Sequence, residues 1–326
     1  MIRRPKKLLA RIIRALLLLL IASCHETLKP QAQRSEELTA SNEVGTLHGT
    51  LLLPSGRPPF PVVLIVAGSG PVDRDGNWVP ALHTDAYRLL AEGLASKGVA
   101  SLRYDKRGVA ASAAAVGRVE EMRIEMEADD VNRFMAVLRR DARLGRLVLA
   151  GHSLGSLLSI LAAEAASADA YASLEGAGRP IGTVLREQLA RQIIDANLLA
   201  QANAIIDQLE AGRTVASVPD VLAALFAPSV QPYLISWMKY DPPRELAKLS
   251  GPALIVQGTT DVQVGVADAQ LLAAARPDAT LAIVQGMCHV LKLAGSSPDS
   301  QRSAYTDPSL PLVPEIVERL AALARP

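Results

Sequence analysis

Residues 146–156 read Arg-Leu-Val-Leu-Ala-Gly-His-Ser-Leu-Gly-Ser and join two different patterns. The first part is a continuous apolar run rich in branched side chains, which predicts a buried β-strand. The apolar residues at 157, 158, 160 and 161 then predict a helix. A strand that turns this sharply into a helix forces the residue at the apex, Ser153, into a strained backbone conformation. Gly151 and Gly155 remove the Cβ atoms that would collide at such a turn.

This turn gives Ser153 a special environment. We expect its hydroxyl to stand above the sheet at the start of the following helix, with the N–H of Leu154 beside it to stabilise an oxyanion. The pattern Gly-x-Ser-x-Gly is short and often matches by accident. With a strand before it and a helix after it, the pattern predicts a nucleophile elbow.

Composition limits what the rest of the chain can be. The 326 residues suit one large domain or two ordinary ones, and 49% apolar residues allow a substantial core. Aromatic residues make up 3%, so the core must be mostly aliphatic and surfaces for stacking sugars or bases are not expected. Without the six basic residues of the first 23, the chain has 28 basic and 33 acidic residues, so we expect no nucleic-acid partner.

The N-terminus has the pattern of a targeting segment. Basic residues precede the apolar run Ala15–Ala22, which is too short to span a bilayer. Ile21-Ala22-Ser23-Cys24 resembles a bacterial lipobox. That resemblance implies a lipoprotein-type signal peptide at 1–23, lipidation of Cys24, and an exported protein anchored to a membrane. An ordinary secretory signal or an uncleaved anchor is the alternative. Residues 24–43 are predicted to be a polar tether. Lipidation of Cys24 would leave Cys288, the other cysteine, unpaired, so no intrachain disulfide is expected.

From residue 44 to 326 the apolar pattern alternates between strands and helices. We expect strands near 44–53, 61–67, 99–104, 146–150, 170–174, 253–257 and 279–284. We expect helices near 83–97, 120–143, 266–275 and 314–324. This order predicts an α/β fold with a mostly parallel central sheet and helices on both faces. The alternation stops between 176 and 249, where only helical spacing is found. We interpret that segment as an inserted helical lid, with plain packing helices as the alternative.

Two loops follow predicted strands and carry glycine or charge. Gly68-Ser69-Gly70-Pro71 follows the second strand, and the N–H of Ser69 is a candidate second oxyanion donor, although a tight turn without a ligand is the plainer interpretation. Asp73-Arg74-Asp75-Gly76-Asn77 looks like the start of a calcium loop. The bidentate glutamate would fall near Thr84, so no calcium site is expected. The charges of Asp105-Lys106-Arg107 are expected to fix their loop by ion pairs.

Three residues with complementary chemistry each follow the end of a predicted strand. These are Ser153, Asp261 and His289, in that chain order, and loops at the carboxyl ends of parallel strands meet at one edge of a sheet. A serine hydroxyl is a poor nucleophile until a neutral imidazole accepts its proton, and the imidazole needs a carboxylate to hold its tautomer. We therefore assign Ser153 as nucleophile, His289 as general base and then acid, and Asp261 as the orienting carboxylate. Asp241 and Asp268 are the competing acids.

Together these elements resemble the bacterial α/β-hydrolases loosely grouped with serine aminopeptidases and dienelactone-hydrolase-like esterases. The resemblance covers about residues 44–326 and rests on the loops at 68–77 and 103–108, the elbow at 151–155, Asp261 and His289. It implies an α/β-hydrolase fold and a hydrolase without metal or cofactor, usually acting on carboxylic esters. One departure concerns the oxyanion loop, because many hydrolases carry His-Gly where this chain has Ala67-Gly68.

The favoured function is a serine esterase that forms an acyl-enzyme on Ser153 with a small-molecule ester. The aliphatic lid helices suggest small or medium hydrophobic acyl groups. A peptidase or amidase is the alternative within the enzymes; it usually needs an acid to hold the substrate amine, and Glu175 or acids of the lid could supply one. A lipid-anchored binding protein on the same fold is the alternative from another class.

Overall fold

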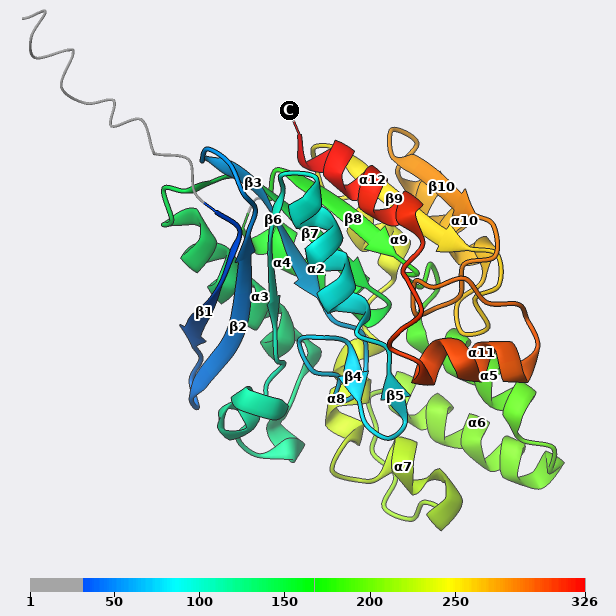
Figure 1. Cartoon of the computed structure of the whole chain (residues 1–326). Helices are drawn as coiled ribbons and strands as arrows, with labels where there is room; N and C mark the ends of the chain where they lie inside the picture. The colour runs from blue at the N-terminus through cyan, green and yellow to red at the C-terminus, as the bar shows by residue number, and fades with distance from the viewer. Residues whose placement is uncertain (1–31, 167, 326) are drawn as a thin grey trace, which may run out of the picture.

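The computed structural model describes residues 32–166 and 168–325 of the chain (Figure 1). The predicted signal peptide and Cys24 lie outside these residues. Among the described helices, none combines the length and the apolar character that crossing a membrane requires.

Eight strands form the central sheet, in the order β1-β2-β6-β3-β7-β8-β9-β10. Their bounds are β1 Arg34–Ser41, β2 Thr46–Leu53, β3 Phe60–Val66, β6 Ala100–Tyr104, β7 Leu144–His152, β8 Ala170–Leu174, β9 Ala253–Gly258 and β10 Thr280–Val284. The strands from β6 to β10 all pair in parallel, whereas β2 runs antiparallel to both β6 and β1. The prediction of a mostly parallel sheet is confirmed.

Helices cover both faces of this sheet (Figure 1). Their bounds are α2 Ala86–Ser96, α3 Ile124–Arg139, α4 Leu154–Ala165, α10 Val266–Ala275 and α12 Pro314–Ala324. Alternate residues of β3 face opposite cores, because side chains along a strand alternate between its two faces. Val63 and Ile65 pack in the core of α2 and α12, and Val62 and Leu64 pack in the core of α3 and α4. The continuous apolar run of this strand therefore reflects burial on both sides.

Some elements differ from the sequence-based expectation. β1 lies inside the segment expected to be a tether, and the structure pairs it along its whole length with β2. Of its residues only Ala40 is buried, so backbone pairing rather than an apolar face holds this edge strand. The expected helix at 120–143 is a short turn of 3₁₀-helix at Val119–Glu121 followed by α3. Four further described elements had no prediction: the hairpin of β4 Asn77–Trp78 and β5 Leu82–His83, the 3₁₀-helix Ala110–Ala115, and helix α11 Pro298–Thr306.

The segment between β8 and β9 is helical, as expected. It contains α5 Ile181–Gln192, α6 Ala196–Glu210, α7 Ala223–Phe226, α8 Gln231–Trp237 and α9 Pro242–Leu246. Residues of α5 to α8 bury a small core of their own, and these helices lie together beyond one edge of the sheet (Figure 1). That arrangement is compatible with a lid and equally with packing helices, so the role of the segment stays a prediction.

Candidate active site

Ser153 lies at a sharp turn between β7 and α4. Its φ is 54° and its ψ −121°, a conformation that few residues other than glycine adopt. Two hydrogen bonds hold the turn, from the Ser153 N–H to the Leu174 carbonyl at 2.9 Å and from the Ser156 N–H to the Ser153 carbonyl at 3.0 Å. A Cβ on Gly151 would lie 2.1 Å from the Gly155 carbonyl oxygen, and a Cβ on Gly155 would lie 2.1 Å from the Val66 oxygen. Both glycines are therefore required by close backbone contact.

The loop after β3 packs directly against Ser153. A Cβ on Gly68 would lie 3.1 Å from the Cβ of Ser153, and the Gly68 carbonyl accepts a hydrogen bond from the Lys106 ammonium at 2.6 Å. The peptide unit is planar and trans, so fixing the Gly68 carbonyl also fixes the direction of the Ser69 N–H. Ser69 and Leu154, the two expected oxyanion donors, line one cavity of about 280 Å³.

The acid and the histidine of the expected triad are in contact. His289 Nδ1 lies 2.7 Å from Asp261 Oδ2, and both side chains are almost completely buried. The other oxygen, Asp261 Oδ1, accepts hydrogen bonds from the N–H of Gln263 at 2.7 Å and of Val264 at 3.0 Å. Burial alone would raise the pKa of Asp261, but the His289 imidazole, a hydrogen bond from Glu175 and the Val264 N–H hold this pKa well below its usual range. Asp261 is thus a fixed carboxylate against His289.

His152, which precedes Ser153 in the chain, connects the two halves of the site. His152 Nε2 lies 2.7 Å from the His289 carbonyl, which can only accept, so Nε2 carries the proton. Burial and the neighbouring His289 lower the pKa of His152 to about 3, so its ring is neutral and Nδ1 accepts the Tyr87 hydroxyl proton at 2.8 Å. The same hydroxyl accepts the Gly68 N–H at 3.2 Å. A chain of hydrogen bonds therefore runs from the oxyanion loop to the backbone of His289.

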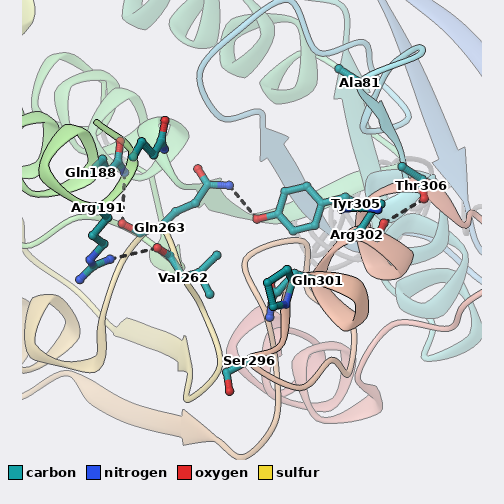
Figure 2. A pocket seen from close by; sticks show the side chains of 12 residues that line it. Ala81, Gln188, Arg191, Val262, Gln263, Ser296, Gln301, Arg302, Tyr305 and Thr306 are labelled. Atoms are coloured by element: carbon teal, nitrogen blue, oxygen red, sulfur yellow. Dashed lines mark hydrogen bonds between the residues drawn. The ribbon is translucent and has the colours of Figure 1, made fainter. Parts of the chain in front are cut away.

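A larger hollow of about 720 Å³ is lined in part by the loop that follows Asp261 (Figure 2). It lies between α5, α11 and the loop after β9, and its lining includes Val262 and Gln263, which directly follow Asp261. The Gln263 amide donates to the Tyr305 hydroxyl at 2.7 Å, as drawn in Figure 2. Glutamines and the arginines Arg191 and Arg302 supply much of its polar surface. This hollow offers space for a ligand group next to the loop that carries Asp261.

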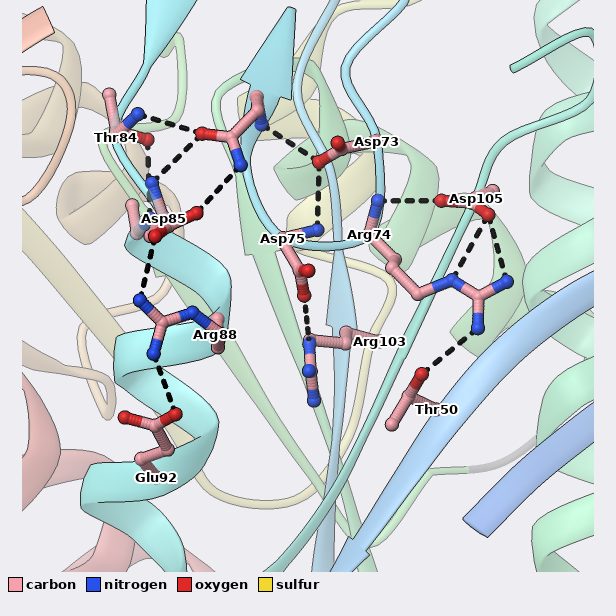
Figure 3. A network of polar contacts seen from close by, with 12 residues as sticks. Thr50, Asp73, Arg74, Asp75, Thr84, Asp85, Arg88, Glu92, Arg103 and Asp105 are labelled. Atoms are coloured by element: carbon pink, nitrogen blue, oxygen red, sulfur yellow. Dashed lines mark hydrogen bonds and ion pairs between the residues drawn. The ribbon is translucent and has the colours of Figure 1, made fainter. Parts of the chain in front are cut away.

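The charged loops that the sequence analysis singled out form a structural network (Figure 3). The Arg74 guanidinium pairs with Asp105 at 2.8 Å, and the Arg103 guanidinium pairs with Asp75 at 2.7 Å. Asp73 Oδ1 accepts the backbone N–H of Asp75 and of residue 77, each at 2.9 Å. The expectation that ion pairs fix the Asp105 loop is confirmed. Side-chain oxygens of the calcium-like sequence are engaged by protein groups, namely by backbone N–H groups at Asp73 and by Arg103 at Asp75.

One group of side chains in the site has the composition of a metal site. Donor atoms of Glu175, Asp261 and His289 lie within 4.8 Å of one another. A cation bound through His289 Nδ1 would replace the 2.7 Å contact with Asp261, so metal binding there competes with the histidine orientation. Glu175 is also unsuited to hold a substrate amine as the sequence had suggested, because it is fully buried and accepts the Gly258 N–H at 2.9 Å.

Several residues of the site were missed by sequence reasoning. Tyr87, Lys106 and Gln257 lie on a helix, a loop and a strand whose patterns predict only burial or ion pairing. For Glu175 the sequence does carry a signal, because this glutamate directly follows a strand that is predicted to be buried. Its side chain is fully buried in the structure, which is unusual for a glutamate.

Parts of the chain are similar to known proteins. Residues 81–176 match the family described as serine aminopeptidase, S33. A relative, Esterase EstD of Thermotoga maritima, is 29% identical over 245 residues; the alignment covers 74% of this chain and 55% of the relative, so the chain spans about half of that protein's length.

Solved structures share the fold over most of the chain. Est1E from Butyrivibrio proteoclasticus, solved with ferulic acid bound, has a TM-score of 0.58 at 18% identity, covering 87% of this chain and 98% of its own. The Pyrococcus furiosus esterase Pf2001 has a TM-score of 0.55 at 15% identity, covering 92% and 97%. At these identities the likeness concerns the fold. The sheet order, the elbow and these matches together show that the chain has the α/β-hydrolase fold, with a central part that resembles the serine aminopeptidases.

Proposed function

We propose that this protein is a serine carboxylesterase that forms an acyl-enzyme on Ser153. The observation that carries the proposal is the 2.7 Å contact between His289 Nδ1 and Asp261, at the same sheet edge as the strained Ser153. The similarity to Esterase EstD and to esterases of the same fold supports it. Neutral ester hydrolysis requires only a nucleophile, a base and an oxyanion site, and candidates for all three lie together here.

The proposed reaction has two half-reactions. Ser153 Oγ attacks the ester carbonyl carbon while His289 Nε2 accepts the hydroxyl proton, and the carbonyl oxygen becomes an oxyanion that accepts the N–H of Leu154 and Ser69. The carbon–oxygen bond to the alcohol then breaks, and His289 returns the proton to the leaving alkoxide. Water repeats the sequence on the acyl-enzyme: His289 takes a water proton, the hydroxide adds to the carbonyl, and the acid leaves as Ser153 regains its proton.

The two cavities suggest where the substrate lies. The 280 Å³ cavity borders both oxyanion donors, so we assign it to the acyl group, and its small volume favours short acyl chains. Tyr233 of α8 contributes to this cavity, which supports a lid role for the helical segment. The 720 Å³ hollow borders the loop of Asp261 and suits the alcohol, because the leaving oxygen must receive its proton from His289.

The decisive test is hydrolysis of p-nitrophenyl esters of increasing acyl length by the detergent-solubilised full chain. We expect turnover of short esters and a loss of about 10³-fold or more in kcat for Ser153→Ala. Ser250→Ala, which changes an exposed serine away from the site, is the matched control and keeps full activity. Equal inactivity of wild type and Ser153→Ala on all esters would sink the esterase proposal.

A peptidase acting on aminoacyl substrates is the second candidate, and one observation favours it. Glu127 lines the same cavity as the oxyanion donors and accepts the Tyr233 hydroxyl at 2.7 Å, so a carboxylate is available near a substrate amine. Aminoacyl p-nitroanilides separate the two functions. Faster hydrolysis of these amides than of all simple esters, abolished by Glu127→Gln, would replace the esterase by the peptidase. If the protein hydrolyses neither esters nor amides, the remaining alternative is a lipid-anchored binding protein on the same fold.

We also propose that the protein is exported and held on a membrane by a lipid on Cys24. The lipobox-like sequence before Cys24 is the support for this anchor. Metabolic labelling with a radioactive fatty acid should mark the wild type and leave Cys24→Ser unlabelled. Labelling of both proteins, or of neither, would contradict the anchor without bearing on the chemistry at Ser153.

A further inference from the structure

Glu175 is a buried carboxyl group with no part in the reaction described above. It directly follows β8, its side chain is completely buried, and its φ of 53° is rare for a residue other than glycine. Its backbone N–H donates to the Val256 carbonyl at 2.9 Å, and its Oε1 accepts the Gly258 N–H at 2.9 Å. Burying a carboxyl in a strained backbone conformation costs free energy, which is a reason to ask what the group does.

Glu175 belongs to the same cluster as the acid and the histidine. Donor atoms of Glu175, Asp261 and His289 lie within 4.8 Å of one another. The Gln257 side-chain amide joins the two carboxyl groups: it donates to Asp261 Oδ2 at 3.3 Å and contacts Oε2 of Glu175. The same amide donates to the Val264 carbonyl at 2.9 Å. The two carboxyl groups are thus held against each other in a closed set of contacts.

The groups around this cluster can stabilise the negative charge of only one ionised carboxylate. The titratable groups that face Glu175 are Asp261, His289, Cys288 and Tyr305. Within residues 32–166 and 168–325, no Lys or Arg nitrogen lies within 4.0 Å of it. Two buried carboxylates this close repel strongly, so one of the two carries a proton.

The proton belongs on Glu175. Asp261 faces the imidazole and accepts two backbone N–H groups on its other oxygen, whereas Glu175 accepts one backbone N–H. Hydrogen bonds to the charged form favour ionisation, so Asp261 is the better carboxylate. Burial, and next the charge of Asp261, raise the pKa of Glu175 well above its usual range, which agrees with the geometry.

We propose that Glu175 is a positioning residue that keeps its proton at neutral pH and donates it in a hydrogen bond to the Asp261 carboxylate. This inference rests on the proposed function for its kinetic consequences, but the protonation itself does not depend on turnover. The hydrogen bond holds the Asp261 carboxylate toward His289 without adding charge. When His289 becomes an imidazolium during acyl transfer, one negative charge faces one positive charge in the buried cluster.

The proton is tested directly by infrared spectroscopy of the full chain. We expect the carbonyl stretch of a protonated carboxyl group at neutral pH in the wild type, and its disappearance in Glu175→Gln. Glu120→Gln, at a carboxylate whose side chain is 54% exposed, is the matched control and leaves that band unchanged. A band that is missing from the wild type, or that persists in Glu175→Gln, overturns the proposal even if esterase activity is absent from every variant.

Kinetics test the positioning role. The acid limb of kcat/KM against pH reports the ionisation of His289 in the free enzyme. If Glu175 is neutral, Glu175→Gln leaves this limb in place and lowers kcat less than about tenfold, since the amide can still donate to Asp261. If Glu175 were ionised, removing its negative charge would move the limb to lower pH by about one unit, and the proposal would be wrong.

Glu175→Leu completes the set because it removes the donor and keeps an apolar side chain of similar size. We expect kcat to fall about 10- to 100-fold with KM changed by less than about threefold, as for other residues that orient a catalytic group. The downfield proton resonance of the His289–Asp261 hydrogen bond should persist in Glu175→Gln and broaden or vanish in Glu175→Leu. A purely packing role would leave that resonance unchanged in a folded Glu175→Leu protein, and this result would refute positioning.

Discussion

The two halves of the site are held in place by different physical means. On the acid–histidine half, Asp261 is fixed by several donors, including two backbone N–H groups that belong to its own loop. On the oxyanion half, the Gly68–Ser69 peptide depends on two side chains from other elements, Lys106 and Tyr87. Asp261 is thus restrained by several contacts, some of them within its own loop, whereas the Gly68–Ser69 peptide is restrained by two side chains from distant elements. Substitutions should therefore affect the two halves differently.

The largest effect is expected on the acid–histidine half, from Asp261→Asn. An asparagine can present its N–H₂ group to His289 Nδ1, which then carries no proton, so the proton moves to Nε2 and the base cannot accept from Ser153. We expect kcat to fall by about 10⁴-fold with little change in the free energy of unfolding. Ester hydrolysis and urea unfolding measure the two quantities. A loss under tenfold would show that Asp261 is not the carboxylate that orients His289.

A smaller loss of activity is expected on the oxyanion half, from Lys106→Met. The ammonium fixes the Gly68 carbonyl at 2.6 Å, and through the planar peptide it fixes the Ser69 N–H. Losing one properly aimed oxyanion donor costs about 10²- to 10³-fold in kcat, and we expect a loss at or below that range. KM should change little. An unchanged kcat would show that the Ser69 N–H is not an oxyanion donor.

The same variant carries a prediction about pH, because burial lowers the pKa of Lys106 below its value in the unfolded chain. The unfolded state then binds more protons than the folded state between the two pKa values, so this residue's contribution to stability rises with pH in that window. The wild type should gain stability relative to Lys106→Met as pH increases through the lowered pKa toward the pKa of a free lysine. Urea unfolding at several pH values measures this gain. The opposite slope would mean that the ammonium is stabilised in the fold.

This contrast also explains what could be read from the sequence. The parallel sheet was predictable because burial on both faces requires a continuous apolar sequence, as in β3. The elbow was predictable because its close backbone contacts require glycine at 151 and 155. Asp261 and His289 were identified because loops at strand ends meet at one edge of a sheet. β1 was missed because an edge strand held by backbone pairing needs no apolar alternation.

The supporting contacts could not be predicted, for a different reason. Lys106 sits in a charged sequence that predicts ion pairs, and its neighbours Asp105 and Arg107 do form them, yet Lys106 itself donates to a carbonyl 38 positions away. Tyr87 meets His152 across 65 positions. Such contacts depend on how helices and loops are placed in space, and no local pattern encodes the pairing.

The smallest of these effects should come from Tyr87→Phe, at the point where the two halves are joined. The hydroxyl accepts the Gly68 N–H at 3.2 Å and donates to His152 Nδ1 at 2.8 Å, so phenylalanine leaves two buried polar groups without this partner while the ring stays in place. We expect about 1–3 kcal/mol lower free energy of unfolding and a kcat loss of about three- to tenfold. Restraint on Gly68 by Lys106 remains in this variant, which is why the loss is modest. If Tyr87 and Lys106 act independently, Tyr87→Phe and Lys106→Met lower log kcat additively. A double variant no worse than Lys106→Met alone would show that both residues act through the same Gly68–Ser69 peptide.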